Sequence, residues 1–139
     1  MKTLDVNNQS PLIIPNYLAS SVIDIDYKEI RKSGVEYVAF DADSTLVTSR
    51  KRLLDEETKK YLERELRIFK GVCIASNRIT NDLHEIANDL NARTVRASLT
   101  TRKPSVKFFH RVVELFQTKP ANIVMIGDTL RTDIAGGNK

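Results

Sequence analysis

Four short, mainly apolar runs alternate with longer segments of helical pattern, and this alternation limits the fold more than any other feature. The expected strands are residues 35–40, 72–75, 94–97 and 123–126. Strands of this kind, separated by helices, are typical of a parallel sheet that is covered on both faces. The sequence therefore predicts an α/β protein with a three-layer, Rossmann-like parallel sheet.

Segments between these runs carry apolar residues at helical spacing. We expect helices at 27–32, at 55–69, in a segment that begins at Thr80 or Asn81 and includes 83–90, at 104–116 and at 132–135. Asp26 and Asp55 are the expected N-caps of the first two helices, and Gly34 and Gly71 are expected to end them. In the fourth helix we expect the buried face to contain Val106, Phe109, Val113 and Phe116.

A length of 139 residues favours one domain. Residues 1–20 contain two prolines and no clear period, so we expect an N-terminal arm, extended with one short helix, before a core at 21–139. The single cysteine, Cys73, excludes an internal disulfide and a multi-cysteine zinc site. It indicates a reducing compartment, most simply the cytoplasm.

The net charge of +4 suits an anionic partner such as a phosphate ester, a nucleic acid or an acidic membrane surface. The basic residues are scattered, and no basic stripe is interleaved with aromatic residues. We therefore expect no nucleic-acid partner.

Polar groups follow each expected strand at its carboxyl end. They are Asp41 and Asp43, then Ser76 and Asn77, then Lys103, and finally Asp128. The carboxyl ends of parallel strands meet at one edge of the sheet, where ligands of such folds bind. The sequence therefore predicts that these groups converge on one site.

Asp41 and Asp43 are the most informative pair. Two carboxylates two residues apart can share a hard cation such as Mg²⁺. One can attack phosphorus while the other transfers protons. The competing interpretation, two solvated loop aspartates followed by a helix-capping Thr45, is disfavoured because the pair directly follows an apolar strand.

The other groups fit phosphate chemistry, although each alone also fits a turn, a helix cap or a surface lysine. Ser76 and nearby backbone N–H groups suit the non-transferring phosphoryl oxygens, and Lys103 suits a point-charge contact with phosphate. Asp128 and Asp133, around a glycine-containing turn, would complete a metal site.

These residues resemble the four motifs of the haloacid dehalogenase (HAD) superfamily. The matching segments, in order, are 40–47, Ser76-Asn77, Lys103-Pro104 and 127–133. Residues 21–138 also resemble the cap-less subclass IIIA phosphatases of the YqeG-like, phosphatidylglycerophosphatase-like kind. The similarity to this narrower family lies at 23–26, 102–104 and 132–138.

The resemblance implies a role for each residue. Asp41 would form an aspartyl-phosphate, and Asp43 would protonate the leaving group and then activate water. Mg²⁺ would be bound by Asp41, the backbone carbonyl of Asp43 and Asp128. The remaining residues would hold the phosphoryl group (Ser76, Asn77 and Lys103) or support the metal ligands (Asp133 and Thr45).

The chain departs from the family pattern in two ways. Ala42 and Ser44 stand where the narrower family more often has leucine and asparagine. The sequence also stops just after the fourth motif, where family members continue with at least one more strand, so we expect a HAD-like core truncated at its C-terminus.

Both segments in which a cap domain is usually inserted are short. We therefore expect an open site, which suits a bulky substrate, a membrane-bound headgroup, or closure by a neighbouring subunit in a homo-oligomer.

The predicted function is that of a magnesium-dependent phosphomonoesterase. Its expected substrate is phosphatidylglycerophosphate, which implies peripheral membrane contact, or a soluble phosphorylated metabolite. The alternatives are a catalytically inactive homologue and a receiver-like phosphate-binding module. In receivers the acceptor aspartate comes later in the chain than the acidic pair, which is not the order here.

Overall fold

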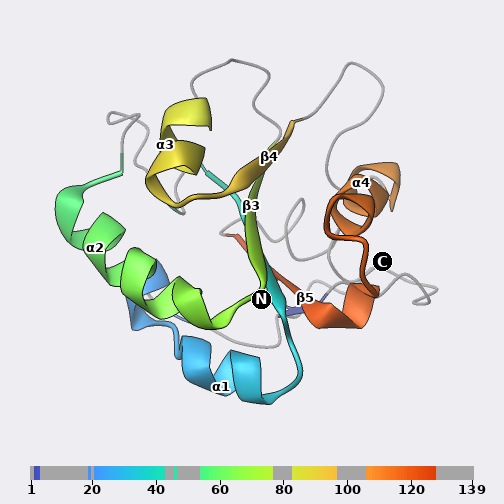
Figure 1. Cartoon of the computed structure of the whole chain (residues 1–139), viewed down its shortest axis with the longest axis horizontal. Helices are drawn as coiled ribbons and strands as arrows, with labels where there is room; N and C mark the ends of the chain where they lie inside the picture. The colour runs from blue at the N-terminus through green and yellow to red at the C-terminus, as the bar shows by residue number, and fades with distance from the viewer. Residues whose placement is uncertain are drawn as a thin grey trace.

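The computed structural model describes residues 2–3, 19, 21–42, 46, 54–76, 83–96 and 106–127. Its centre is a five-stranded sheet with the order β1-β5-β2-β3-β4 (Figure 1). The strands are β1 (Lys2–Thr3), β2 (Tyr37–Phe40), β3 (Gly71–Ser76), β4 (Arg93–Arg96) and β5 (Ile123–Ile126). Strands β2 to β5 are mutually parallel, whereas β1 pairs antiparallel with β5. The predicted parallel α/β sheet is confirmed.

Strand β2 lies between β3 and β5. Val38 pairs with Val72 of β3 and Val124 of β5, and Phe40 pairs with Ile74 and Ile126. In a parallel sheet this register brings the carboxyl ends of the three strands to one edge. We call this the carboxyl edge, and the opposite side, where the strands begin, the amino edge.

Side chains alternate along each strand between two apolar clusters, one on each face of the sheet. On β2, Val38 and Phe40 belong to one cluster and Ala39 to the other. The first cluster packs against helices α1, α2 and α3, and the second packs against α4 (Figure 1). These three layers match the architecture that the sequence predicts.

Helix α1 (Tyr27–Lys32) begins and ends where the sequence predicts. The Asp26 carboxylate accepts a hydrogen bond from the Glu29 backbone N–H at 3.1 Å. Gly34, with φ of 106°, lies just past the C-cap in the left-handed region that glycine adopts easily.

Helix α2 (Glu56–Glu65) is capped by Asp55, as predicted, and continues into the 3₁₀ helix η2 (Leu66–Ile68). The prediction that Gly71 ends this segment is wrong, because Gly71 is the first residue of β3. A Cβ atom at residue 71 would lie 3.0 Å from ring atoms of Tyr37 and of Phe116. The glycine is therefore needed for close packing at the start of β3.

Helix α3 (Leu83–Asp89) ends in a Schellman motif. The Ala92 N–H donates to the Ala87 carbonyl at 2.7 Å, and the Asn91 N–H donates to the Asn88 carbonyl at 3.2 Å. Asn91 has φ of 52°, the left-handed conformation that this motif requires.

The buried face of helix α4 (Val106–Phe116) agrees in part with the expected one, because Phe109, Val113 and Phe116 all contribute to the cluster on this side of the sheet. Phe108, Phe109 and Val112 are buried, whereas Val113 and Phe116 are only partly buried. The helix packs on the small residues of β2 and β3, Ala39 and Ala75, which leave room for the Phe108 ring.

Three short elements were not predicted. Strand β1 lies within the expected N-terminal arm, the 3₁₀ helix η1 (Val22–Asp24) precedes α1, and the 3₁₀ helix η3 (Pro120–Asn122) replaces a simple turn at Lys119. Of the remaining strands, β5 matches its predicted bounds, β4 begins one residue earlier, and β3 is longer. The expected final helix at 132–135 lies outside the described residues.

The Tyr27 side chain links the segment before β2 to the apolar core. Its ring is 1% exposed, and it contacts the rings of Phe40 and Phe69 at centroid separations of 6.5 and 6.4 Å. Its hydroxyl donates to the Val22 carbonyl at 2.7 Å, which ties the 3₁₀ helix η1 (Val22–Asp24) to the start of α1. Burial raises the pKa of this phenol well above its ordinary value, so it stays a donor.

We predict that Tyr27→Phe lowers the free energy of unfolding by about 1–2 kcal/mol, because the buried Val22 carbonyl loses its donor. Urea denaturation measures the change. Tyr61→Phe is the matched control, since that partly buried tyrosine has no hydroxyl hydrogen bond among the described residues. Equal unfolding midpoints for both variants would contradict the role given to the Tyr27 hydroxyl.

Candidate active site at the carboxyl edge

Asp41 lies at the carboxyl end of β2, between the ends of β3 and β5. Its backbone N–H donates to the Ile126 carbonyl at 2.8 Å, so the hydrogen bonding between β2 and β5 continues one residue past Phe40. The residue is 8% exposed. A carboxylate in so dry a place is costly unless other groups compensate its charge.

The chain turns directly after Asp41. The Leu46 N–H donates to the Ala42 carbonyl at 2.9 Å, and both side chains are buried in the apolar cluster with α1, α2 and α3. Two apolar anchors thus fix the segment that carries Asp41. Ala42 is 0% exposed and is part of the apolar core.

Ser76 is the last residue of β3 and is 1% exposed. Phe40 pairs with Ile74, and β3 continues two residues beyond this pair to Ser76. Neighbouring strands lie about 4.8 Å apart. Asp41 and Ser76 therefore both lie at the carboxyl edge, on neighbouring strands.

Strand β5 leads Gly127 to the same edge, and Asp128 is the next residue in the sequence. Strand β4 also ends there, with Arg96 paired to Ser76. The other predicted site residues lie outside the described part of the chain. They are Asp43, Thr45, Asn77, Lys103, Asp128 and Asp133.

The described residues supply only part of a metal site. Among them, no three His, Cys, Asp or Glu side chains are grouped closely enough to hold a metal ion. Of the three residues predicted to bind Mg²⁺, only Asp41 is among the described residues.

The connection between Leu46 and Leu54, which follows β2, is short. Residues 47–53 separate the buried anchors Leu46 and Leu54, which both pack in the core. Domains have 50 or more residues, so a cap domain cannot be inserted there. None of the helices in the described ranges is both long enough and apolar enough to cross a bilayer.

One feature of the structure is not indicated by any sequence motif. A hollow of about 540 Å³ lies at the amino edge, where β2 and β3 begin and where α3 and α4 end. Its residues are far apart in the sequence, and the only local signals are Asn91 and Gln117 at the helix ends. Sequence reasoning therefore missed it.

Comparison with known proteins supports the fold and the phosphatase chemistry. The sequence model of the HAD-hydrolase-like family matches residues 100–139. The probable phosphatase YqeG of Bacillus subtilis (strain 168) is 27% identical over 126 residues, which cover 91% of this chain and 72% of that protein.

One solved structure has a similar fold. A crystal structure of an uncharacterized protein from Listeria monocytogenes superposes with a TM-score of 0.57 at 21% identity, covering 75% of this chain and 73% of that one. The magnesium-bound YfnB of Bacillus subtilis, described as a HAD-hydrolase, gives a TM-score of 0.47 at 20% identity, covering 63% of this chain and 42% of that one. This second likeness is too weak to add to the argument. The chain is thus similar to HAD-type hydrolases in its C-terminal segment, in its overall similarity to YqeG and in its parallel α/β sheet.

Proposed function

We propose that this protein is a magnesium-dependent phosphomonoesterase in which Asp41 attacks the phosphorus of a phosphate ester. The observation that carries the proposal is the position of Asp41, a buried carboxylate at the carboxyl end of the central strand. The end of a central strand is where α/β sheets of this kind bind their ligands. Packing of the core does not require a carboxylate at this position, whereas a carboxylate nucleophile must be held in a fixed position.

The nearby residues suit the transfer of a phosphoryl group. Ser76 ends the strand that pairs with β2, and its hydroxyl is assigned to donate to a non-transferring phosphoryl oxygen. We assign Asn77 and Lys103 to the same task. Donors that are fixed in place before the reaction stabilise charge as it shifts in the transition state.

The chemistry of the donor set suits Mg²⁺, which prefers oxygen ligands and binds through one or two carboxylates together with substrate phosphate. Asp41, the backbone carbonyl of Asp43 and Asp128 would hold the ion, with Asp133 and Thr45 supporting these ligands. When bound, the ion supplies positive charge that reduces repulsion between a carboxylate nucleophile and an anionic phosphate.

The reaction then proceeds in two steps on the residues of this chain. An Asp41 oxygen forms a bond to phosphorus while the ester P–O bond breaks, and Asp43 donates a proton to the leaving oxygen. In the second step Asp43 takes a proton from water, and the water oxygen displaces Asp41 and releases inorganic phosphate. Asp41 is thereby restored.

For the substrate we propose phosphatidylglycerophosphate, presented by a membrane that the protein contacts peripherally. The short connection between Leu46 and Leu54 supports this choice, because a site without a cap can approach a headgroup in a bilayer. The similarity of the chain to a probable phosphatase supports the reaction class, and the sequence resemblance to subclass IIIA supports the lipid.

Asp41→Asn should lower the rate of magnesium-dependent hydrolysis of p-nitrophenyl phosphate by at least about a thousandfold, because the nucleophile is lost. Absorbance of released nitrophenolate measures the rate, with and without excess chelator. Asp24→Asn is the matched control, since Asp24 is an exposed residue whose carboxylate accepts from the Ser21 hydroxyl. It should retain full activity.

Activity in the Asp41→Asn variant, or in excess chelator, would contradict the mechanism. A wild-type protein that keeps a phosphoryl group from acetyl phosphate without turning it over would instead indicate a receiver-like module.

Ser76→Ala should lower kcat/KM for the same substrate by about a hundredfold, because one donor to the phosphoryl group is removed. Ser76→Thr, which retains a hydroxyl, should recover part of the activity. Ser33→Ala is the control, because the Ser33 hydroxyl only donates to the Ile30 carbonyl at the end of α1. Unchanged kinetics in Ser76→Ala, with a folded protein by circular dichroism, would exclude the assigned contact.

A substrate panel tests the lipid assignment separately. We expect kcat/KM for phosphatidylglycerophosphate in mixed micelles to exceed the values for glucose 6-phosphate and AMP by at least about tenfold. Phosphate release measures all three under the same conditions. Equal and low values would reject the lipid substrate and leave the general phosphatase assignment intact.

A further inference from the structure

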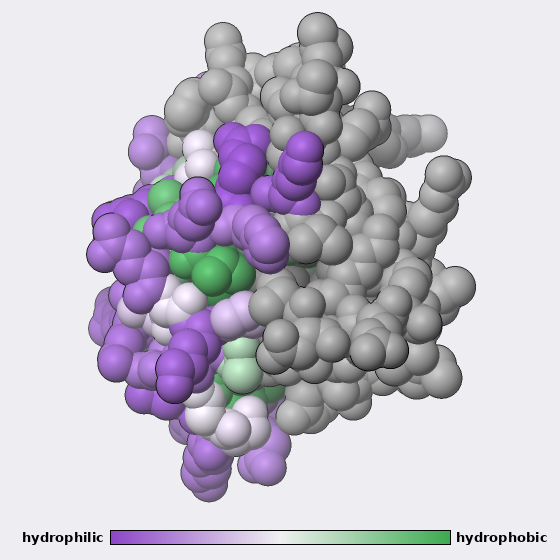
Figure 2. All heavy atoms as spheres, turned by 90° about the vertical axis from the view of Figure 1, so that its right-hand side faces the viewer, coloured by the Kyte–Doolittle hydropathy of each residue, from purple (hydrophilic) through white to green (hydrophobic). Residues whose placement is uncertain are grey.

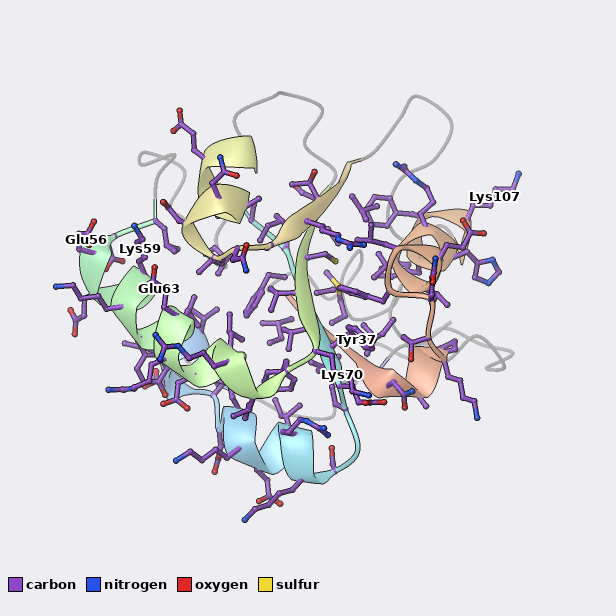
Figure 3. All side chains as sticks on the ribbon, viewed as in Figure 1. Tyr37, Glu56, Lys59, Glu63, Lys70 and Lys107 are labelled. Atoms are coloured by element: carbon purple, nitrogen blue, oxygen red, sulfur yellow. The ribbon has the colours of Figure 1, made fainter. Side chains whose placement is uncertain are left out.

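The hollow at the amino edge lies at the far end of the sheet from Asp41. Its volume of about 540 Å³ falls in the range of small-molecule pockets. Its principal lining residues are Tyr37, Lys70, Asn91, Arg93, Phe116 and Gln117. Figure 3 shows Tyr37 and Lys70 together at the end of the sheet where β2 and β3 begin.

Aromatic rings and two helix ends give the hollow a fixed shape. The rings of Tyr37 and Phe116 are stacked with centroids 4.5 Å apart, directly over Gly71. Asn91 and Gln117, with φ of 52° and 51°, end α3 and α4 at its rim. Because α3 closes with a Schellman motif, Asn91 is held in its unusual conformation by hydrogen bonds of the backbone.

Arg93 gives the hollow a positive charge without an acidic partner among the described residues. Its Nη1 donates to the Leu115 carbonyl at the end of α4, at 3.2 Å, and this satisfies one carbonyl at the negative end of that helix. Arg93 is exposed, and its guanidinium has further N–H groups that can donate. A planar anion can accept from these groups.

Lys70 adds a second cation, which pairs with Glu36. The hydrogen bond from Lys70 lowers the pKa of Glu36, and Arg31 lowers it further, so this carboxylate faces two cations. The same hydrogen bond raises the pKa of Lys70, which stays protonated. The described residues that line the hollow thus include two cations, Lys70 and Arg93, and no acidic residue.

The face of the molecule that includes α4 is otherwise mainly hydrophilic. Figure 2, viewed from the side on which α4 lies in Figure 1, shows small green areas between purple ones in its described part. The lining of the hollow is likewise mainly polar, and the stacked rings of Tyr37 and Phe116 are its aromatic part.

We propose that this hollow binds a small organic anion, with its carboxylate or phosphate on Arg93 and Lys70 and its apolar body against Tyr37 and Phe116. Strand β3 runs from Gly71 in the hollow to Ser76 at the carboxyl edge, a length of about 17 Å at roughly 3.3 Å per residue. The ligand therefore cannot take part in chemistry at Asp41. The proposal does not depend on the proposed function.

Phthalate is a suitable probe, because it has two carboxylates on a planar ring, and dimethyl phthalate is its uncharged counterpart. We expect phthalate to give saturable ¹H–¹⁵N shift changes at the backbone amides of Gly71, Asn91, Arg93 and Gln117, with a Kd of about millimolar order. Dimethyl phthalate should give none at the same concentration. Equal shifts with both compounds would overturn the assignment to an anion.

Arg93→Gln should raise the Kd for phthalate about fivefold or more, because a charged donor is lost. Arg67→Gln is the matched control, since Arg67 lies on η2 and does not line the hollow. Lys70→Gln should also raise the Kd for phthalate. Because Lys70 is exposed, this variant provides the test if Arg93→Gln fails to fold. An unchanged Kd in folded Arg93→Gln or in Lys70→Gln would refute the proposal.

The Asp41→Asn variant distinguishes this hollow from the carboxyl edge. Phthalate should shift the same four amides in that variant, with an unchanged Kd. Loss of the shifts in Asp41→Asn would mean that phthalate binds at the carboxyl edge, and it would overturn the assignment of the hollow.

Discussion

Parallel pairing of β2 with β3 and β5 is the constraint on which the rest of the structure depends. The paired register of Val38 and Phe40 with both neighbours sets where each strand ends. It thereby brings Asp41 and Ser76 to one edge, although the two residues are far apart in the sequence. The same pairing brings Tyr37 and Gly71 to the other edge, so one ladder of hydrogen bonds determines both the candidate active site and the hollow.

Alternation along the strands explains why this pairing has one stable arrangement. A shift of one residue in the register of β2 would move Val38 and Phe40 to the face that Ala39 occupies. Bulky side chains would then lie against α4, where small ones are required. The Phe108 ring of α4 fits against the sheet because Ala39 and Ala75 face it. Register and helix packing therefore reinforce each other.

The sequence predicted correctly the helices and strands that depend on interactions between nearby residues. Asp26 and Asp55 cap their helices, and the apolar run at 123–126 is β5, because capping and burial depend on nearby residues. Strand β1 has two residues and exists through its pairing with β5, a contact that no local pattern encodes. The role of Gly71 was misjudged for the same reason, since the rings that exclude a Cβ atom come from β2 and α4.

The candidate site was predictable to the extent that it follows strand ends. Asp41 and Ser76 lie where the apolar runs before them indicate, whereas the other predicted residues lie outside the described part of the chain. The hollow was not predictable, because it forms where two helix ends meet two strand starts. Neither Arg93 nor Lys70 differs in sequence from an ordinary surface cation.

The buried thiol of Cys73 gives the protein an internal reporter of its own opening. Cys73 is the chain's single cysteine, it is 0% exposed, and it lies in β3 between β2 and β4. A thiol reagent can reach the sulfur only when the centre of the sheet separates, so its labelling rate follows that event and ignores fraying at the chain ends. The stability of the sheet centre can thus be followed in the unaltered protein, without an added probe.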